Sequence, residues 1–208
     1  MSTEALFPTL VYAARLAAKP RRELRERLLR EALQLRADDA AGRAWSRDNY
    51  PGGYTSYGSL CRLQTLSPTF ARLQHWLDAH ARGFARALRF DLRGRKLAMT
   101  DCWVNLMPRG VAHGLHLHPQ SVLSGTYYVQ VPAGSAAIKF EDPRLDRFMA
   151  APPRRARAGR VAGHGGSWVT MPADEGTVLM FESWLRHEVP AQRVRGLRVS
   201  VSFNYGWF

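Results

Sequence analysis

Three histidines of this 208-residue chain lie in two short stretches where their spacing could bind a metal. Side chains two residues apart in an extended strand point to the same face, so His116 and His118 can offer two imidazoles to one ion. Leu117 between them is expected to face the opposite packing layer. His187 would close the site from another strand. Three neutral imidazoles suit iron, copper or zinc and leave coordination positions open for a substrate or oxygen.

Length and composition favour a single globular domain. The chain is 46% hydrophobic, which is enough to bury one sizeable core. We expect residues 1–96 to form an N-terminal helical region packed on a core formed by residues 97–208. The cysteines Cys61 and Cys102 give no disulfide framework, and the first residues do not form a signal peptide. No segment has the uncharged length needed to span a bilayer, so we expect a cytoplasmic protein without a membrane partner.

The chain is strongly basic, with 30 Lys and Arg against 17 Asp and Glu and a formal net charge of +13. Such a charge would attract an acidic small molecule, a peptide or a nucleic acid. Acidic residues interrupt the arginines of the first predicted helix, which favours a solvated, salt-bridged face over a nucleic-acid stripe. The arginine-rich segment 152–166 is expected to be a mobile basic loop.

The first half of the chain shows two helical patterns. One begins near Pro20 and carries apolar residues at helical spacing, and the other has an N-cap at Ser67, proline at position 68 and an apolar stripe that continues to Gly94. Between them, residues 42–59 are rich in Gly, Ser and aromatic residues, which predicts a long ordered loop. This loop could be a lid over the site or could pack its aromatic residues on the core.

From Leu97 the apolar residues alternate, which predicts a β-rich second half. The expected strands cover residues 97–107, 115–118, 122–131, 136–140, 166–171, 177–183 and 198–205, and a further short strand begins near residue 6. Helices followed by many short strands, without alternation between the two, favour an antiparallel sandwich or barrel with helices packed on one sheet.

Four stretches of the second half occur in a characteristic order: Trp103-Val-Asn105, His116-Leu-His118-Pro119, Ser124-Gly-Thr-Tyr-Tyr128, and His187-Glu-Val-Pro190 followed by Arg198-Val-Ser200. Over residues 97–205 this arrangement resembles the iron(II)/2-oxoglutarate-dependent dioxygenases, especially a bacterial and phage group related to the prolyl hydroxylases. The resemblance implies a double-stranded β-helix, or jelly roll, with two ligands on one strand and the third on a later strand.

The metal ligands implied by the resemblance are His116 and His187, with His118 where the family usually has an Asp or Glu. The site would then contain three imidazoles, or it would recruit a carboxylate such as Asp142 or Glu141. Three neutral ligands leave the ion its full positive charge, which would strengthen binding of the 2-oxoglutarate dianion.

The resemblance also implies that Arg198 anchors the distal carboxylate of 2-oxoglutarate. Strand alternation supports this role, because it places Arg198 and Ser200 together on the face opposite the apolar valines. Tyr128 matches a position where the family uses a phenol to hold the same carboxylate, and Asn105 matches a strand position near the cofactor. Only one of Tyr127 and Tyr128 can face the site.

The implied reaction uses Fe(II), 2-oxoglutarate and O2, hydroxylates an unidentified substrate, and releases succinate and CO2. The expected substrate is a small molecule or peptide, which the basic charge would allow to be acidic; we do not expect nucleic acid, and a homodimer is compatible with the sequence. Two alternatives share the jelly roll. One is a cupin-like metalloenzyme, although the acid of the cupin motif is missing after His118, and the other is a metal-binding protein without catalysis.

Overall fold

The computed structural model describes residues 2–4, 6–149, 152 and 166–208. Nearly all of the expected basic loop therefore lies outside the described residues. The elements, in chain order, are β1 (Val11–Arg15), α1 (Ala18–Asp38), α2 (Ala40–Asn49), β2 (Tyr54–Thr55), α3 (Leu63–Leu66), α4 (Pro68–Ala87), β3 (Leu97–Met107), β4 (His113–His116), β5 (Leu123–Gln130), β6 (Ile138–Glu141), the 3-10 helix η1 (Leu145–Met149), β7 (Trp168–Met171), β8 (Thr177–Glu182), β9 (His187–Val189) and β10 (Arg198–Trp207).

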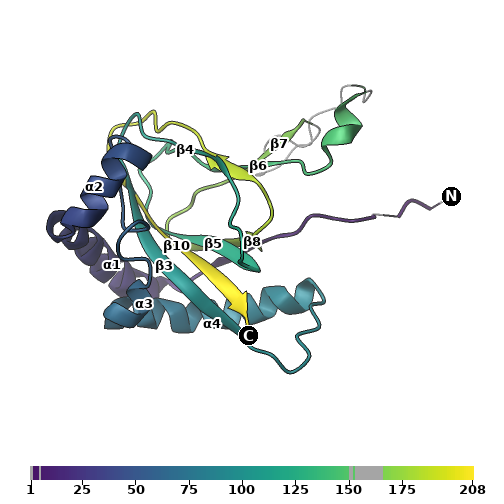
Figure 1. Cartoon of the computed structure of the whole chain (residues 1–208), viewed down its shortest axis with the longest axis horizontal. Coiled ribbons are helices and arrows are strands. Elements are labelled where there is room, and N and C mark those ends of the chain that lie inside the picture. The colour runs from purple at the N-terminus through teal and green to yellow at the C-terminus, as the bar shows by residue number, and fades with distance from the viewer. Residues whose placement is uncertain (1, 5, 150–151, 153–165) are drawn as a thin grey trace.

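The strands within these residues form two antiparallel sheets. The larger sheet has the order β1-β8-β5-β10-β3-β2, and the smaller has the order β4-β9-β6-β7. Figure 1 shows the smaller sheet on one side of the larger one and α1 and α4 on the other. The prediction of a mainly β protein with a double-stranded β-helix and helices packed on one sheet is confirmed.

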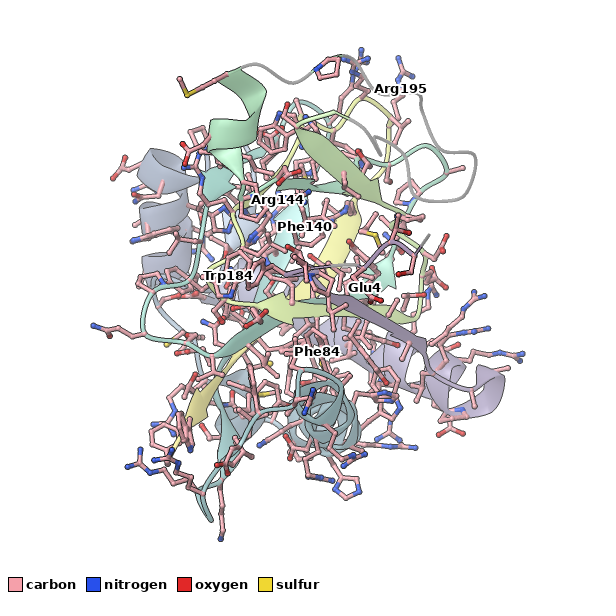
Figure 2. The ribbon with its side chains drawn as sticks, turned by 90° about the vertical axis from the view of Figure 1, so that its right-hand side faces the viewer. Glu4, Phe84, Phe140, Arg144, Trp184 and Arg195 are labelled. Carbon is pink, nitrogen blue, oxygen red and sulfur yellow. The ribbon has the colours of Figure 1, made fainter. Side chains whose placement is uncertain are left out.

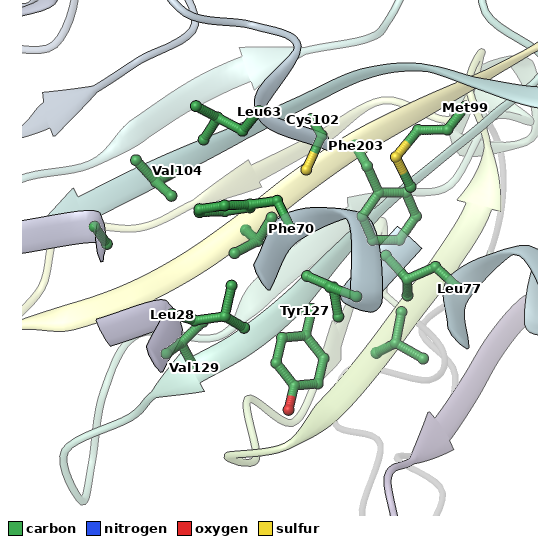
Figure 3. Close-up of a cluster of buried hydrophobic side chains, with 14 of the residues drawn as sticks. Leu28, Leu63, Phe70, Leu77, Met99, Cys102, Val104, Tyr127, Val129 and Phe203 are labelled. Carbon is green, nitrogen blue, oxygen red and sulfur yellow. The ribbon is translucent and has the colours of Figure 1, made fainter. Parts of the chain in front are cut away.

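The helices cover the larger sheet because their apolar stripes are buried against it. Helix α4 begins as expected, since the Ser67 hydroxyl accepts a hydrogen bond from the Thr69 amide and proline occupies the first turn. The shared hydrophobic cluster, shown in Figure 3, includes Leu28, Leu63, Phe70, Leu77, Met99, Val104, Tyr127, Val129 and Phe203. Burying each such large side chain contributes roughly 1.5–3 kcal/mol.

A second hydrophobic cluster lies on the other face of the larger sheet, between it and the smaller sheet. It contains Phe140 from β6 and Phe181 from β8, whose ring centroids are 4.9 Å apart, together with Tyr128 and Tyr50. Figure 2 shows Phe84 on the helical side of the larger sheet and Phe140 on the opposite side. The larger sheet is therefore covered on both faces, and its two faces carry different side chains.

Several sequence predictions need correction. Residues 42–49 of the expected loop belong to helix α2, because the Asp39 side chain caps this helix by accepting a hydrogen bond from the Gly42 amide at 2.8 Å. Helix α4 ends at Ala87 and does not continue to Gly94. The strand expected at 115–118 covers His113–His116 instead, and the strand expected near residue 6 begins at Val11.

The first 96 residues also contribute two strands to the larger sheet. Strand β1 pairs with β8, and the two-residue strand β2 pairs with β3 at one edge. Strand β2 places the end of helix α2 beside the interior of the jelly roll. No helix among the described residues combines the length and the apolar character that crossing a membrane requires.

Candidate metal centre

The three histidines singled out by their spacing meet at one point between the two sheets. His116 and His187 are direct partners in the antiparallel pair of β4 and β9. His118 follows β4, where its amide donates a hydrogen bond to the Ser183 carbonyl at 3.0 Å. One ligand atom from each of the three imidazoles lies within 4.8 Å of the others, so the group could hold a metal ion.

Backbone hydrogen bonds orient two of these imidazoles. The Nδ1 atom of His116 is 2.7 Å from the Gly114 carbonyl oxygen, and the Nδ1 atom of His187 is 2.9 Å from the Leu185 carbonyl oxygen. A carbonyl oxygen can only accept, so each Nδ1 carries the hydrogen and each Nε2 keeps its lone pair. A backbone carbonyl that fixes the tautomer in this way is typical of metal-binding histidines.

The surroundings of the histidines favour the uncharged imidazole that a metal requires. Burial is the largest cause that lowers the pKa of His187 to about 3 and the pKa of His118 to about 4, and the neighbouring His116 contributes to both shifts. A buried imidazolium loses its hydration without gaining a counter-charge, so the neutral ring is favoured. Both residues are therefore neutral near pH 7.

The chain near His118 differs in one respect from the expected alternation. Strand β4 ends at His116, and Leu117 is 42% exposed instead of packing against an opposite layer. His118 nevertheless lies beside His116, with ring centroids 5.2 Å apart. The expected juxtaposition of the two histidines is therefore present although His118 is outside the paired strand.

Neither acid considered as an alternative ligand lies in this group. Glu141 forms an ion pair with Arg186, in which Oε2 and Nη2 are 2.7 Å apart. The Arg144 guanidinium donates to both Asp142 carboxylate oxygens, at 3.0 Å from Nε and 2.9 Å from Nη2. In the pair of β6 and β9, Phe140 and not Glu141 lies opposite His187. The cluster of possible ligands among the described residues is purely histidine.

A buried arginine lies at the floor of the same region. Arg198 is 2% exposed, its Nη1 is 3.8 Å from the Met107 sulfur, and its guanidinium carbon is 5.1 Å from the centre of the Tyr128 ring. No acidic side chain of the described residues forms an ion pair with it. A buried cation without a counter-charge is costly, so an anionic ligand at this position would stabilise the protein.

Several buried polar atoms in the region of Arg198 lack hydrogen-bond partners. The Tyr128 hydroxyl, the Asn105 side-chain oxygen and the Arg198 Nε are buried and make no hydrogen bond to the described residues. Ser200 lies opposite Asn105 on β3 and opposite Tyr128 on β5, so these side chains share one face of the sheet. The Asn105 side-chain nitrogen donates to the Ser202 hydroxyl at 3.0 Å, which fixes its orientation.

The histidine cluster and the polar residues around Arg198 line one cavity of about 440 Å³. Its lining includes the three histidines, Arg198, Ser200 and Asn105. This volume is within the roughly 300–1,000 Å³ of small-molecule sites. No Asp or Glu of the described residues lines it. The cavity therefore joins a possible metal site to a buried cation, as the sequence pattern predicted.

One wall of the cavity comes from residues to which the sequence reasoning gave no specific site role. Trp45, Tyr57 and Trp103 form a chain of ring contacts with centroid distances of 6.0 and 5.0 Å, and Trp103 is 5.9 Å from His118. The recurring aromatic residues of 42–59 were the sequence signal for Trp45 and Tyr57, and Trp103 belongs to the Trp103-Val-Asn105 stretch of the family resemblance. Helix α2 packs on the protein and its end lines the cavity, and a role as a lid stays a prediction.

Comparison with known proteins agrees with this geometry. Residues 101–204 match the model of a family described as "Putative 2OG-Fe(II) oxygenase". The chain belongs to this family of iron(II)- and 2-oxoglutarate-dependent oxygenases. It is thus an oxidoreductase, and the cupin-like alternative is set aside. A search of curated proteins finds no match.

Solved structures similar to this chain share its fold. A prolyl-4-hydroxylase from Pseudomonas putida is 15% identical with a TM-score of 0.61, over 95% of this chain and 92% of that chain. The viral collagen prolyl hydroxylase of Paramecium Bursaria Chlorella virus-1 is 11% identical with a TM-score of 0.57, over 94% of both chains. HygX from Streptomyces hygroscopicus, solved with nickel and 2-oxoglutarate bound, is 14% identical with a TM-score of 0.58, over 95% of this chain and 82% of that chain.

Proposed function

We propose that this oxygenase hydroxylates a small molecule or a peptide residue at a site formed by His116, His118, His187 and Arg198. In the balanced reaction, a substrate C–H bond, 2-oxoglutarate and O2 give the hydroxylated substrate, succinate and CO2. The observation that carries the proposal is a single cavity containing three convergent imidazoles and a buried guanidinium without a counter-charge.

The histidines fit an iron(II) ion by their donor type and orientation. The Nε2 atoms of His116 and His187 are available because their Nδ1 atoms bond to backbone carbonyls, and His118 supplies a third neutral nitrogen. Imidazole nitrogen is a suitable ligand for iron. When bound, iron(II) supplies the activation of O2. The chain's task is to hold the three nitrogens at one point and to limit the access of water.

The floor of the cavity fits the distal carboxylate of 2-oxoglutarate. Arg198 offers a planar pair of N–H donors that matches the two oxygens of a carboxylate. The buried Tyr128 hydroxyl and the Ser200 hydroxyl lie on the same sheet face and can add donors. Asn105, oriented by Ser202, would then face the middle of the co-substrate with its polar side chain.

The substrate would enter along the aromatic wall formed by Trp45, Tyr57 and Trp103. Tyr57 is 49% exposed, so its ring is accessible from solvent, and the wall leads to His118. Ring faces of this kind bind apolar or ring-shaped groups. Apart from Arg198, no charged side chain of the described residues lines the cavity. The basic charge of the whole chain would therefore attract an acidic substrate to the surface, but it would not contact the substrate inside the cavity.

Succinate release under oxygen tests this proposal. Iron-loaded protein is incubated with 2-oxoglutarate and a panel of metabolites and peptides, and succinate is measured with and without each candidate. The expected result is succinate formation that needs iron and rises with a true substrate, and a matched His187→Ala protein should form none. Stoichiometric iron and bound 2-oxoglutarate without succinate in any mixture would contradict the proposal.

A further inference from the structure

Tyr50 is a buried tyrosine that lies at the end of α2, outside the residues matched by the family model. Tyr50 belongs to the part of the N-terminal region that lines the cavity of the three histidines and Arg198. The Tyr50 amide donates to the Ser46 carbonyl at 2.8 Å, and the Gly53 amide donates to the Tyr50 carbonyl at 3.0 Å. A Cβ on Gly53 would lie 2.4 Å from the Tyr50 ring, so the turn needs glycine for the ring to pack against its backbone.

The Tyr50 ring also stacks on His113, with a centroid distance of 4.3 Å and an interplanar angle of 24°. His113 begins β4, the strand that also carries His116. Tyr50 packs in the same hydrophobic cluster as Met107 and Tyr128. Because the ring packs against Gly53, His113 and this cluster, its hydroxyl has a fixed position between the N-terminal region and the sheet.

The Tyr50 hydroxyl is buried and has no hydrogen-bond partner among the described residues. Burial raises the pKa of Tyr50 above its ordinary range, and the positive charge of Arg198 opposes this rise. The phenol is therefore neutral and remains a donor, and Tyr50 and Arg198 line the same cavity. Leaving such a donor unpaired when it is buried is unfavourable, and an acceptor on a bound ligand would remove this cost.

Tyr127 shows that an unpartnered hydroxyl alone is not a sign of a site. Its hydroxyl is also buried without a partner, but its ring belongs to the helix-side cluster and contacts Trp76 at 5.8 Å. Tyr127 does not line the cavity, whereas Tyr50 lines it together with Arg198. What separates the two residues is the shared cavity with a buried, unpaired cation.

We propose that Tyr50 donates a hydrogen bond to the carboxylate bound by Arg198, which makes it a further binding residue for 2-oxoglutarate. This inference rests on the proposed function. A carboxylate has about four acceptor positions. Two N–H groups of Arg198, the Tyr128 hydroxyl and the Tyr50 hydroxyl would occupy them, so the co-substrate would supply acceptors for the buried donors of these three residues. The N-terminal region would thereby complete a pocket whose other donors come from the jelly roll.

The test compares Tyr50→Phe with Tyr127→Phe, each of which removes one buried, unpartnered hydroxyl and keeps the ring. Calorimetry on the Mn(II)-loaded proteins without oxygen measures the affinity for 2-oxoglutarate and for 2-oxovalerate, which has a methyl group in place of the distal carboxylate. We expect Tyr50→Phe to weaken 2-oxoglutarate about ten-fold or more and to leave 2-oxovalerate unchanged, since only 2-oxoglutarate has a carboxylate at the distal end. Tyr127→Phe should change neither affinity.

Equal weakening of both ligands by Tyr50→Phe, or no weakening of either, would overturn the inference. Metal stoichiometry and the unfolding midpoint of each variant show that the protein is intact. Arg198→Ala, measured with the same two ligands, separates this inference from the proposed function. If Arg198→Ala discriminates between the ligands and Tyr50→Phe does not, only the role of Tyr50 fails. If Arg198→Ala does not discriminate, the proposed carboxylate site fails and the role of Tyr50 fails with it.

Discussion

Neighbouring residues of strand β10 face two different environments. On the face covered by the helices, Val199, Val201 and Phe203 are fully buried in the apolar cluster and have no polar atoms to satisfy. On the other face, Arg198 and Ser200 line the cavity and Arg198 has no counter-charge among the described residues. The alternation of one strand thus separates the residues that stabilise the fold from those we propose to bind the co-substrate.

The same division occurs in β5 between Tyr127 and Tyr128. Tyr127 packs with the helices, and Tyr128 packs on the opposite face under the Arg198 guanidinium. Both hydroxyls are buried and unpartnered, so burial and chemistry alone do not distinguish them. The difference between the faces indicates that changes on the helix side should act on stability and changes on the cavity side should act on ligand binding.

The largest expected effect is the loss of metal from the cavity side. Replacing His116, His118 and His187 together by alanine removes every member of the only possible metal group among the described residues. We expect near-complete loss of bound divalent metal in elemental analysis, with the fold retained. The exposed His75 on α4 provides a control, since His75→Ala should keep full metal occupancy. Stoichiometric metal in the triple variant would show that the site assignment is wrong.

Removing a large side chain from the helix-side core should lower stability and leave ligand binding nearly unchanged. Phe203 is fully buried, so Phe203→Ala should lower the free energy of unfolding by about 3–5 kcal/mol. Chemical denaturation measures this loss. The affinities of the folded protein for metal and 2-oxoglutarate should stay within a few-fold of the parent. A variant with unchanged stability and weakened ligand binding would contradict the separation between the two faces.

His118 occupies the position at which the resemblance implies a carboxylate ligand. His118→Ala should weaken metal binding at least as much as the 10- to 100-fold expected from losing a residue that only orients a ligand. His118→Asp should still bind metal, because it restores the usual ligand set on the same side of the chain. Metal titration distinguishes the two variants. If His118→Ala binds iron and turns over like the parent, His118 is not a ligand.

Arg198→Ala should produce a smaller change that is confined to the co-substrate. A charge-assisted contact contributes about 1.5–3 kcal/mol, so 2-oxoglutarate affinity should fall roughly ten- to a hundred-fold while metal occupancy stays intact. Without ligand, removing a buried cation that lacks a counter-charge should not lower the unfolding midpoint. A lower midpoint with unchanged affinity in calorimetry would identify Arg198 as a structural residue.

Much of the fold could be predicted because it depends on local periodicity. The boundaries of β3 agree with the alternation that begins at Leu97, and Ser67 caps α4 as its sequence indicates. Helix α2 was missed because its sequence, AAGRAWSRDN, has no apolar stripe at helical spacing, and the cap at Asp39 and tertiary packing decide its conformation. The three-residue strand β9 is too short to show a period, although His187 within it was recognised.

The candidate site was predictable where its residues share a strand or follow a recognisable order. His116 and His118 are two residues apart in the sequence, as are Arg198 and Ser200 on β10. Because side chains two residues apart in a strand share a face, the sequence predicted that each pair lies together. Tyr50 and His113 could not be placed in the same way. Their stacking depends on how α2 meets β4, and that contact is set by tertiary packing between segments far apart in the sequence.

The central claim is that the three imidazoles and the Arg198 pocket act on one co-substrate. Titrating 2-oxoglutarate into the iron(II)-loaded protein without oxygen, while recording the visible spectrum, tests it most directly. We predict an absorption band that requires both iron and 2-oxoglutarate, is lost in His187→Ala, and needs a higher 2-oxoglutarate concentration in Arg198→Ala. A protein that binds stoichiometric iron but shows no such band at saturating 2-oxoglutarate would contradict the account.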